Sequence, residues 1–316
     1  MSSNTYSASE QAILTTLLYS DIFSFPLTKE EIWEFLINGK KIAREEFDKG
    51  LSSLKKIIVF KDGFYCLKGR EAIILKRLQN ASEVEKKMQR ALAISEKIFR
   101  IPSVLFIGIS GGLAVKNVTK DDDIDLVIIV KKNTLFITRL LILSILESQG
   151  VRRSRNQKNT SDTICVNLLF DETALDWFAT FRDMYTAREI AQMKPLFERD
   201  NMYQRFLSAN SWIQVFLPNL PGISLQKQNP ISNLYYDTPA RKLRNDNSKE
   251  RFLSMLFLNF FPESLTRFLQ MSIMKRHQSI ETISKHVLAF HPYDYRLKTL
   301  KQMKLKMLQF GLLTKI

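Results

Sequence analysis

Two apolar runs, separated by a glycine pair and an acidic segment, constrain this chain more than any other feature of its sequence. The first run, residues 103–109 (SVLFIGI), is short and continuous, which is typical of a buried strand. Residues 110–112 (SGG) follow it, and after ten further residues DIDLVIIV (123–130) forms a second run with the composition of a strand. The pattern predicts two strands of one sheet, joined by a glycine turn and a short connection.

The Asp-x-Asp pattern and the glycine pair together are typical of a site for a cation and a phosphate. Residues two apart in a strand project to the same face, so Asp123 and Asp125 are predicted to lie side by side. Two such carboxylates repel each other unless a cation lies between them, and a hard divalent cation prefers oxygen ligands. Because glycine has no Cβ, the backbone N–H groups of Gly111 and Gly112 can approach an anion closely. The sequence therefore predicts a metal–triphosphate site.

The segment IGISGGLAVKNVTKDDDIDLVIIV (107–130) resembles the signature of the DNA polymerase beta-like nucleotidyltransferase superfamily, in which an apolar strand, Gly-Ser and an Asp-x-Asp strand follow one another. With MYTAREIAQMKPLF (184–197) and FHPYDYR (290–296), the chain is similar to a bacterial group in which a winged helix precedes the transferase domain. The resemblance implies that Asp123 and Asp125 hold Mg²⁺ (or Mn²⁺) against a nucleoside triphosphate, from which a nucleotidyl group moves to an acceptor hydroxyl. The residues implied to bind the nucleotide are Ser110, Gly111, Gly112 and Lys116.

Two positions depart from the superfamily pattern. Serine commonly follows the first glycine; with Gly111 as that glycine, Gly112 takes the serine's place, whereas another register puts Ser110 there. The third carboxylate of the superfamily commonly lies on a later strand, predicted here at residues 164–170 (ICVNLLF), where the polar candidate is Asn167. Asn167 can be a neutral oxygen ligand but not a general base, so a slow or inactive enzyme is an open alternative. The acids that flank this strand are Asp162 and Asp171.

The first 69 residues have the pattern of a winged helix. Three helices are predicted over 9–20, 28–36 and 43–55, the second opened by a capping box of Thr28 and Glu31. Asp62-Gly63 between two β-rich runs then predicts a hairpin. This order resembles the winged helix-turn-helix domains of bacterial regulators, which implies DNA binding by the third helix. The alternatives are contact with a protein partner and a structural cap. With nine basic and nine acidic side chains, the segment has no excess positive charge for a phosphate backbone.

Three further segments complete the predicted organisation. A connector helix spans 70–101 and ends before Pro102, and the transferase domain occupies 102–184. Residues 185–316 are predicted to form a helical, basic C-terminal domain, with helices over 185–197 and 200–216. A basic cluster before the third strand is either a solvated loop or a guide for the acceptor or the triphosphate. Its members are Arg152, Arg153, Arg155 and Lys158.

Charge, cysteine content and hydropathy limit the partners and the location. The chain has a net charge of +15, and residues 226–316 carry 16 basic and 6 acidic side chains, which favours a polyanionic partner and so an RNA or DNA acceptor. Two cysteines and three histidines argue against a zinc site. The longest apolar run, 135–146, is interrupted by Arg139 and is too short to span a bilayer. With no signal peptide visible, we expect a cytoplasmic protein without a transmembrane segment.

These observations predict an α/β (α+β) protein with three parts: a winged helix, a polymerase beta-like domain with a small mixed sheet, and a helical C-terminal domain. The leading hypothesis is a Mg²⁺-dependent nucleotidyltransferase with Asp123, Asp125 and Asn167 at its catalytic centre. The acceptor is a nucleic acid, a protein or a small molecule. The alternative is a catalytically degenerate, nucleotide-sensing regulator or a toxin–antitoxin component.

Overall fold

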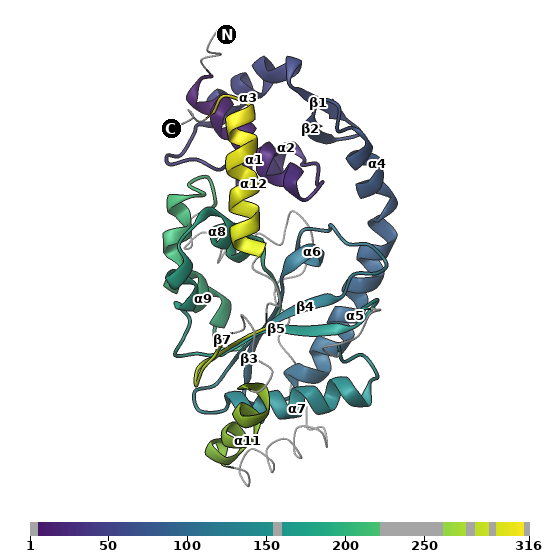
Figure 1. The fold of residues 1–316 in the computed structure, drawn as a ribbon, viewed down its shortest axis with the longest axis vertical. Helices are drawn as coiled ribbons and strands as arrows, with labels where there is room; N and C mark the ends of the chain where they lie inside the picture. The colour runs from purple at the N-terminus through teal and green to yellow at the C-terminus, as the bar shows by residue number, and fades with distance from the viewer. Residues whose placement is uncertain (1–5, 154–159, 222–261, 276–281, 291–294, 313–316) are drawn as a thin grey trace.

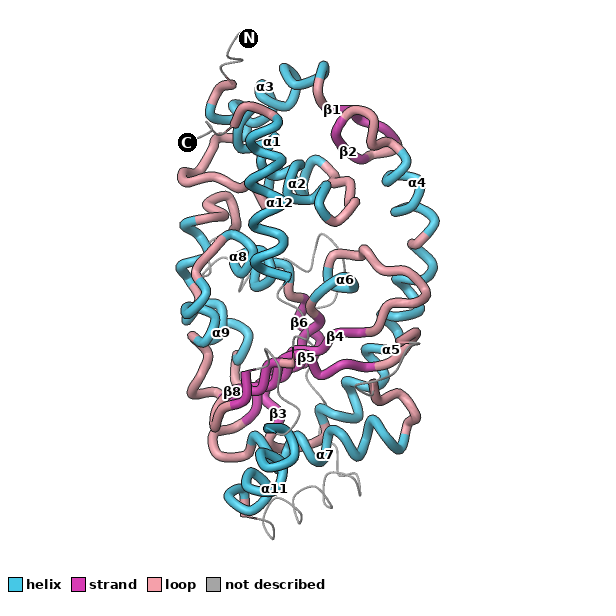
Figure 2. Tube along the Cα trace, viewed as in Figure 1, coloured by secondary structure: helices cyan, strands magenta, loops and turns pink. Residues whose placement is uncertain are grey.

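The computed structural model describes residues 6–153, 160–221, 262–275, 282–290 and 295–312. A mixed sheet lies at its centre (Figures 1 and 2). Its strands are β3 (Val104–Ile109), β4 (Ile124–Val130), β5 (Ile164–Asp171), β6 (Lys194–Glu198), β7 (Thr282–Ile283) and β8 (Val287–Ala289). They are arranged in the order β6-β3-β4-β5-β8-β7. The combination of this sheet with helices on both faces confirms the α+β class.

The three strands predicted around the acidic motif are all present. β3 is antiparallel to both β4 and β6. The chain therefore reverses its direction between the end of β3 at Ile109 and the start of β4. β4 and β5 run parallel and are joined through α7 (Leu135–Ser148), as a parallel pair requires a crossover connection. The glycine pair opens the short helix α6 (Gly111–Ala114) between β3 and β4. The start of β4 therefore lies beside this glycine turn.

The segment after residue 184 is not helical throughout, in contrast to the prediction. The predicted helix over 185–197 is wrong in its second part, because α8 (Met184–Gln192) ends and Lys194–Glu198 forms β6. The residue before a proline is biased towards extended backbone, so Lys194, which precedes Pro195, favours a strand here. β7 and β8 also come from this part of the chain and extend the sheet beyond β5. Three of the six described strands of the central sheet thus follow residue 184.

Side chains along β4 alternate between two apolar clusters on opposite faces of the sheet. Leu126, Ile128 and Val130 pack with α5 (Ala81–Phe99) and α7 on one face. Val127 and Ile129 pack on the other face with α8, α9 (Met202–Ala209) and the 3₁₀ turn η3 (Ser211–Val215) (Figure 1). The same alternation assigns Asp125 to the α8 face. The strand thereby places an acidic pair at the edge of an otherwise apolar interface.

The N-terminal segment contains the predicted three helices and hairpin. The helices are α1 (Ala8–Ile22), α2 (Lys29–Glu34) and α3 (Arg44–Ser53), followed by the 3₁₀ turn η1 (Leu54–Lys56); the strands are β1 (Ile58–Lys61) and β2 (Phe64–Leu67). Thr28 and Glu31 form the predicted capping box at α2. Asp62 and Gly63 both adopt positive φ, which a tight two-residue hairpin turn requires. These local predictions are confirmed.

Helices from two other parts of the chain contact this segment. The predicted connector is divided by Asn80 into α4 (Ala72–Gln79) and α5. The last described helix, α12 (Tyr295–Gln309), packs along α1, and its Met303 is buried in the apolar cluster of α1–α3 (Figure 1). An ion pair of 2.6 Å between Lys306 and Asp21 reinforces this contact. Chain segments from both ends of the sequence therefore pack together.

Two elements complete the description: α11 (Glu263–Lys275), which packs on α7, and the 3₁₀ turn η2 (Trp177–Phe181). The Glu263 carboxylate accepts hydrogen bonds from the backbone N–H groups of Phe136 and Ile137, in the first turn of α7. In the part of the chain that the structure describes, every helix is too short or too polar to cross a membrane.

Candidate functional site

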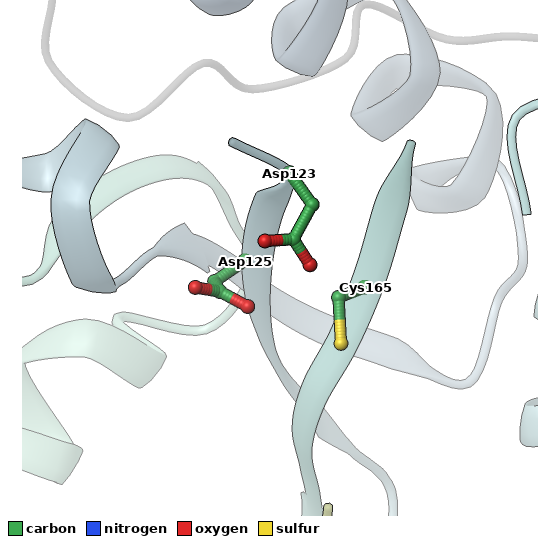
Figure 3. Close-up of side chains that lie close together, drawn as sticks. All are labelled: Asp123, Asp125 and Cys165. Carbon is green, nitrogen blue, oxygen red and sulfur yellow. The ribbon is translucent and has the colours of Figure 1, made fainter. Parts of the chain in front are cut away.

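Asp123, Asp125 and Cys165 form a compact group at the start of β4 and β5 (Figure 3). The parallel register pairs Asp125 with Cys165, so the two side chains are neighbours on the same face of the sheet. One potential ligand atom from each of the three residues lies within 4.8 Å of the others. Among the described histidines, cysteines and acids, this is the one group of three or more with that spacing. The predicted proximity of the two aspartates is therefore present, with a thiol beside them.

The electrostatics of this group favour a cation. Removal from water raises the pKa of Asp125 to about 7, and the neighbouring Asp123 charge adds to the effect. Burial likewise raises the pKa of the Cys165 thiol, so it is protonated at neutral pH. A partly buried carboxyl next to a second carboxylate is a common arrangement at functional sites. A bound cation would reverse the effect by favouring the ionised carboxylates.

Arg153 supplies positive charge to the group from the predicted basic cluster. Its guanidinium donates a hydrogen bond to Asp123 Oδ2. Arg152 points elsewhere and pairs with Glu147 at 3.1 Å on the surface. The other two members of the cluster, Arg155 and Lys158, lie outside the described residues. A side-chain cation therefore binds one of the two carboxylates, Asp123, at the position where the sequence predicts a metal.

The glycine turn closes directly onto the acid pair. The backbone N–H of Ser110 donates to the Asp125 carbonyl at 3.0 Å. Gly111 has φ +62°, and a Cβ at this position would lie 2.7 Å from Asp125 Oδ2. A Cβ on Gly112 would lie 2.8 Å from the backbone oxygen of Asn117, so a serine does not fit there. The buried Ser110 hydroxyl has no hydrogen-bond partner among the described residues. The turn is thus a cradle of small residues next to the carboxylates.

A buried lysine fixes the loop that leads into the acid pair. Lys87, on α5, has no exposed surface, and its Nζ donates to the carbonyls of Lys120 (3.1 Å) and Asp122 (2.7 Å) and to Asp162 Oδ1 (3.1 Å). All three donors of the ammonium group are used. Sequence reasoning missed this residue. The available signal is a lysine within the buried face of α5, next to Met88.

The structure also locates the residues proposed to complete the site. Asn167 lies in a bulge of β5: Leu126 pairs with Val166 and Val127 with Leu168, so Asn167 has no partner on β4. Its carbonyl accepts a hydrogen bond from Phe290 N at 2.9 Å. The register thus places Cys165, rather than Asn167, beside Asp125.

The two flanking acids have other partners. Asp162 binds Lys87 and, at 3.5 Å, Arg90. Asp171 lies at the opposite end of β5 and binds Thr173 and His286. Both carboxylates are therefore engaged away from the acid pair.

Lys116 lies near the N-terminal segment. Partial burial lowers its pKa, and the charged groups that act on it are Glu31, Arg77 and Glu85 rather than the acid pair.

α8 contributes a further carboxyl to the surroundings of the acid pair. Burial raises the pKa of Glu189 to about 7, and the Glu189 charge is among those that raise the pKa of Asp125. Tyr185, one turn earlier on the same helix, also has a pKa raised by burial, with Glu189 as the next cause. Sequence reasoning singled out the segment that contains both residues but assigned neither of them a role.

Two carboxylates, an adjacent glycine cradle and an arginine are chemically suited to a hard cation with a phosphate-bearing ligand. The three kinds of group come from β4, the β3–α6 turn and the segment before β5, which the sheet brings to one place. Comparisons of the chain with known protein families, with curated proteins and with solved structures found no match.

Proposed function

We propose that the protein is a Mg²⁺-dependent nucleotidyltransferase that moves a nucleoside monophosphate group from a nucleoside triphosphate to an acceptor hydroxyl. The observation that carries the proposal is the Asp123–Asp125 pair facing the Gly111 turn, with the Arg153 guanidinium bound to one carboxylate. Two ionised carboxylates side by side are stabilised by a cation, and a glycine turn gives phosphate oxygens access to backbone N–H groups.

The donor set fits Mg²⁺ or Mn²⁺. Mg²⁺ is commonly held by one or two carboxylates together with substrate phosphates and water, so Asp123 and Asp125 suffice. Cys165 is a soft ligand and, because its pKa is raised, a neutral thiol, so we assign it no bond to Mg²⁺. When bound, the metal supplies charge neutralisation for the α-phosphate and the leaving pyrophosphate.

The residues of the chain then position the reactants. The backbone N–H groups at Gly111 and Gly112 bind phosphate oxygens, and the nearby guanidinium of Arg153 provides further positive charge. The acceptor oxygen forms a bond to the α-phosphorus, the bond from the α-phosphorus to the bridging oxygen breaks, and pyrophosphate leaves. The proton of the acceptor hydroxyl passes to water, because Cys165 stands beside Asp125 and offers no carboxylate base. General-base catalysis typically contributes about 10²–10⁴-fold, so we expect slow turnover.

The basic surface of α12 supports a polyanionic acceptor. Lys298, Lys301 and Lys304 are exposed and lie three residues apart, which places them along one side of the helix. At the start of α12, Arg296 binds Asp183, the N-cap of α8, at 2.7 Å. This lysine row therefore begins next to the helix that covers the acid-pair face of the sheet. RNA or DNA is the acceptor class that this charge favours.

A nucleotide sensor that does not turn over is the second candidate, because the residue beside Asp125 is a thiol. A DNA-binding role for α3 has less support. Its exposed side chains include Glu45 and Glu46, and Arg44 is engaged with Glu30. If the sensor candidate holds, a protein partner is a better fit for this helix than a phosphate backbone.

The test uses the full chain with the four α-labelled nucleoside triphosphates, Mg²⁺ or Mn²⁺, and total cellular RNA. The Asp123→Asn/Asp125→Asn variant removes both carboxylate charges, and Asp121→Asn, at an exposed acid two residues earlier, is the matched control. We expect label transfer by the wild type and by Asp121→Asn only, and the labelled species identifies the acceptor class. Nucleotide binding without transfer by the wild type would favour the sensor instead.

A further inference from the structure

The main chain of residues 151–153 is fixed beside the start of β5. Val151 is buried, and its carbonyl accepts a hydrogen bond from Ile164 N at 2.7 Å. Arg153 N donates to the Ile164 carbonyl at 3.2 Å, so the segment extends the parallel pairing by a single bridge at Arg152. The backbone up to the Arg153 N–H is therefore held, and the guanidinium can move by side-chain torsions.

The Arg153 side chain is placed to move. About one third of it is exposed (33%), whereas its partner Asp123 is 17% exposed. Among the described residues, Asp123 is the carboxylate that forms an ion pair with Arg153. A long side chain with a held backbone and an exposed guanidinium can exchange one anionic partner for another without a change in the fold.

Asp123 has two competing partners under the proposed function. A divalent cation bound to Asp123 and Asp125 would lie next to the guanidinium, and like charges this close repel each other strongly. A triphosphate on the Gly111 turn, which lies against Asp125, would offer several anionic oxygens. Arginine binds phosphate well because its planar donor groups match two oxygens at once.

We infer that Arg153 exchanges partners during nucleotide binding: it pairs with Asp123 when no cation is bound and with the triphosphate when metal and nucleotide are bound. This inference rests on the proposed function and adds to it a coupling between metal binding and nucleotide binding. Arg153 opposes metal binding in the absence of nucleotide and favours the metal–nucleotide complex. The site therefore discriminates against a free divalent cation.

The first measurement is Mn²⁺ binding without nucleotide, followed by electron paramagnetic resonance. We compare the wild type with Arg153→Gln and with Arg152→Gln, the matched control whose arginine pairs with exposed Glu147. Arg153→Gln is expected to bind Mn²⁺ about tenfold more tightly, the effect of removing one charge-assisted competitor. Arg152→Gln is expected to match the wild type. Arg153→Lys keeps the charge but not the planar donors, so its Mn²⁺ affinity is expected to lie between those of the wild type and Arg153→Gln. Circular dichroism verifies that all variants fold.

The second measurement is binding of each of the four nucleoside triphosphates at saturating Mn²⁺. The triphosphate that binds the wild type most tightly is expected to bind Arg153→Gln about tenfold more weakly. Unchanged Mn²⁺ affinity, or unchanged nucleotide affinity, in Arg153→Gln overturns the exchange but leaves the proposed function standing. A wild type that binds Mn²⁺ but no nucleoside triphosphate overturns both, because Arg153 then has no second partner.

Discussion

The two ends of the β4–β5 strand pair each hold an aspartate that is largely removed from water, and the two are treated differently. Asp171, only 1% exposed, accepts hydrogen bonds from Thr173 N (3.0 Å), from the Thr173 hydroxyl and from His286 Nδ1 (2.8 Å). Asp125 instead lies beside Asp123 and a neutral thiol, and its pKa is raised to about 7. The fold gives one carboxylate three hydrogen-bond donors and places the other next to a like charge. This difference distinguishes a structural acid from a site.

The loop before the acid pair is also held by internal hydrogen bonds, which Lys87 provides. Lys87→Met would leave two carbonyls and the Asp162 carboxylate without their shared donor, so we expect a loss of about 3 kcal/mol in the free energy of unfolding. Urea denaturation measures this change. We also expect weaker Mn²⁺ binding, because the loop no longer fixes Asp123. Lys86→Met, at an exposed neighbour, is the matched control; equal stability of the two variants would contradict this role.

Neutralising the two strand aspartates one at a time tests the comparison directly. Asp171→Asn removes a charged acceptor of three hydrogen bonds, and we expect it to lower the free energy of unfolding by about 2 kcal/mol without changing Mn²⁺ affinity. Asp125→Asn relieves like-charge repulsion, so we expect unchanged or higher stability at pH 8 with Mn²⁺ binding lost. Thermal unfolding and Mn²⁺ titration report the two effects. If both variants lost stability and kept metal, the assignment of roles would be reversed.

The raised pKa of Asp125 predicts opposite pH trends for metal binding and ion-free stability. Protons compete with the cation, so Mn²⁺ affinity should fall by about tenfold per unit below pH 7 and level off above it. The ion-free fold keeps this proton up to about pH 7, whereas the unfolded chain releases it near pH 4. The Asp125 contribution to stability therefore decreases as the pH rises between these values. Subtracting the Asp125→Asn profile isolates it from Glu189 and Glu34, whose pKa values are also raised to about 7.

The smallest expected effect concerns the residue beside Asp125. If the site lacks a carboxylate base, Cys165→Asp should raise the rate of nucleotidyl transfer by about tenfold. This gain is smaller than that of a natural general base, because the position of the new carboxylate is not optimised. Asn167→Asp places the same group in the bulge and should leave the rate unchanged. Single-turnover kinetics with labelled nucleotide compares the two variants. A gain in Asn167→Asp alone would show that the bulge position completes the site.

The parts of the site that follow from local geometry could be predicted from the sequence. Strand alternation aligned Asp123 with Asp125, and the glycine pair indicated a tight turn beside them. The neighbour of Asp125 could not be predicted, because it depends on the register between β4 and β5 and on a bulge that removes Asn167 from that register. Lys87 was missed because its partners lie 33 to 75 residues away along the chain.

The same limit applies to the fold. The hairpin at Asp62-Gly63 and the three central strands are specified by short segments and were predicted. The contact of α12 with α1 joins the two ends of the sequence, and β6 begins where a helical pattern meets Pro195. Periodicity carries no information about either arrangement, since each is decided by packing between distant segments or by a single backbone constraint.

Calorimetric titration of each nucleoside triphosphate into the protein, with and without Mg²⁺, tests the central claim most directly. The wild type and the Asp123→Asn/Asp125→Asn variant are compared, with Asp121→Asn as control. The account predicts Mg²⁺-dependent binding of at least one nucleoside triphosphate to the wild type and the control, and no Mg²⁺-dependent binding to the double variant. Absence of binding in the wild type, or equal binding in the double variant, would contradict a metal–triphosphate site at the acid pair.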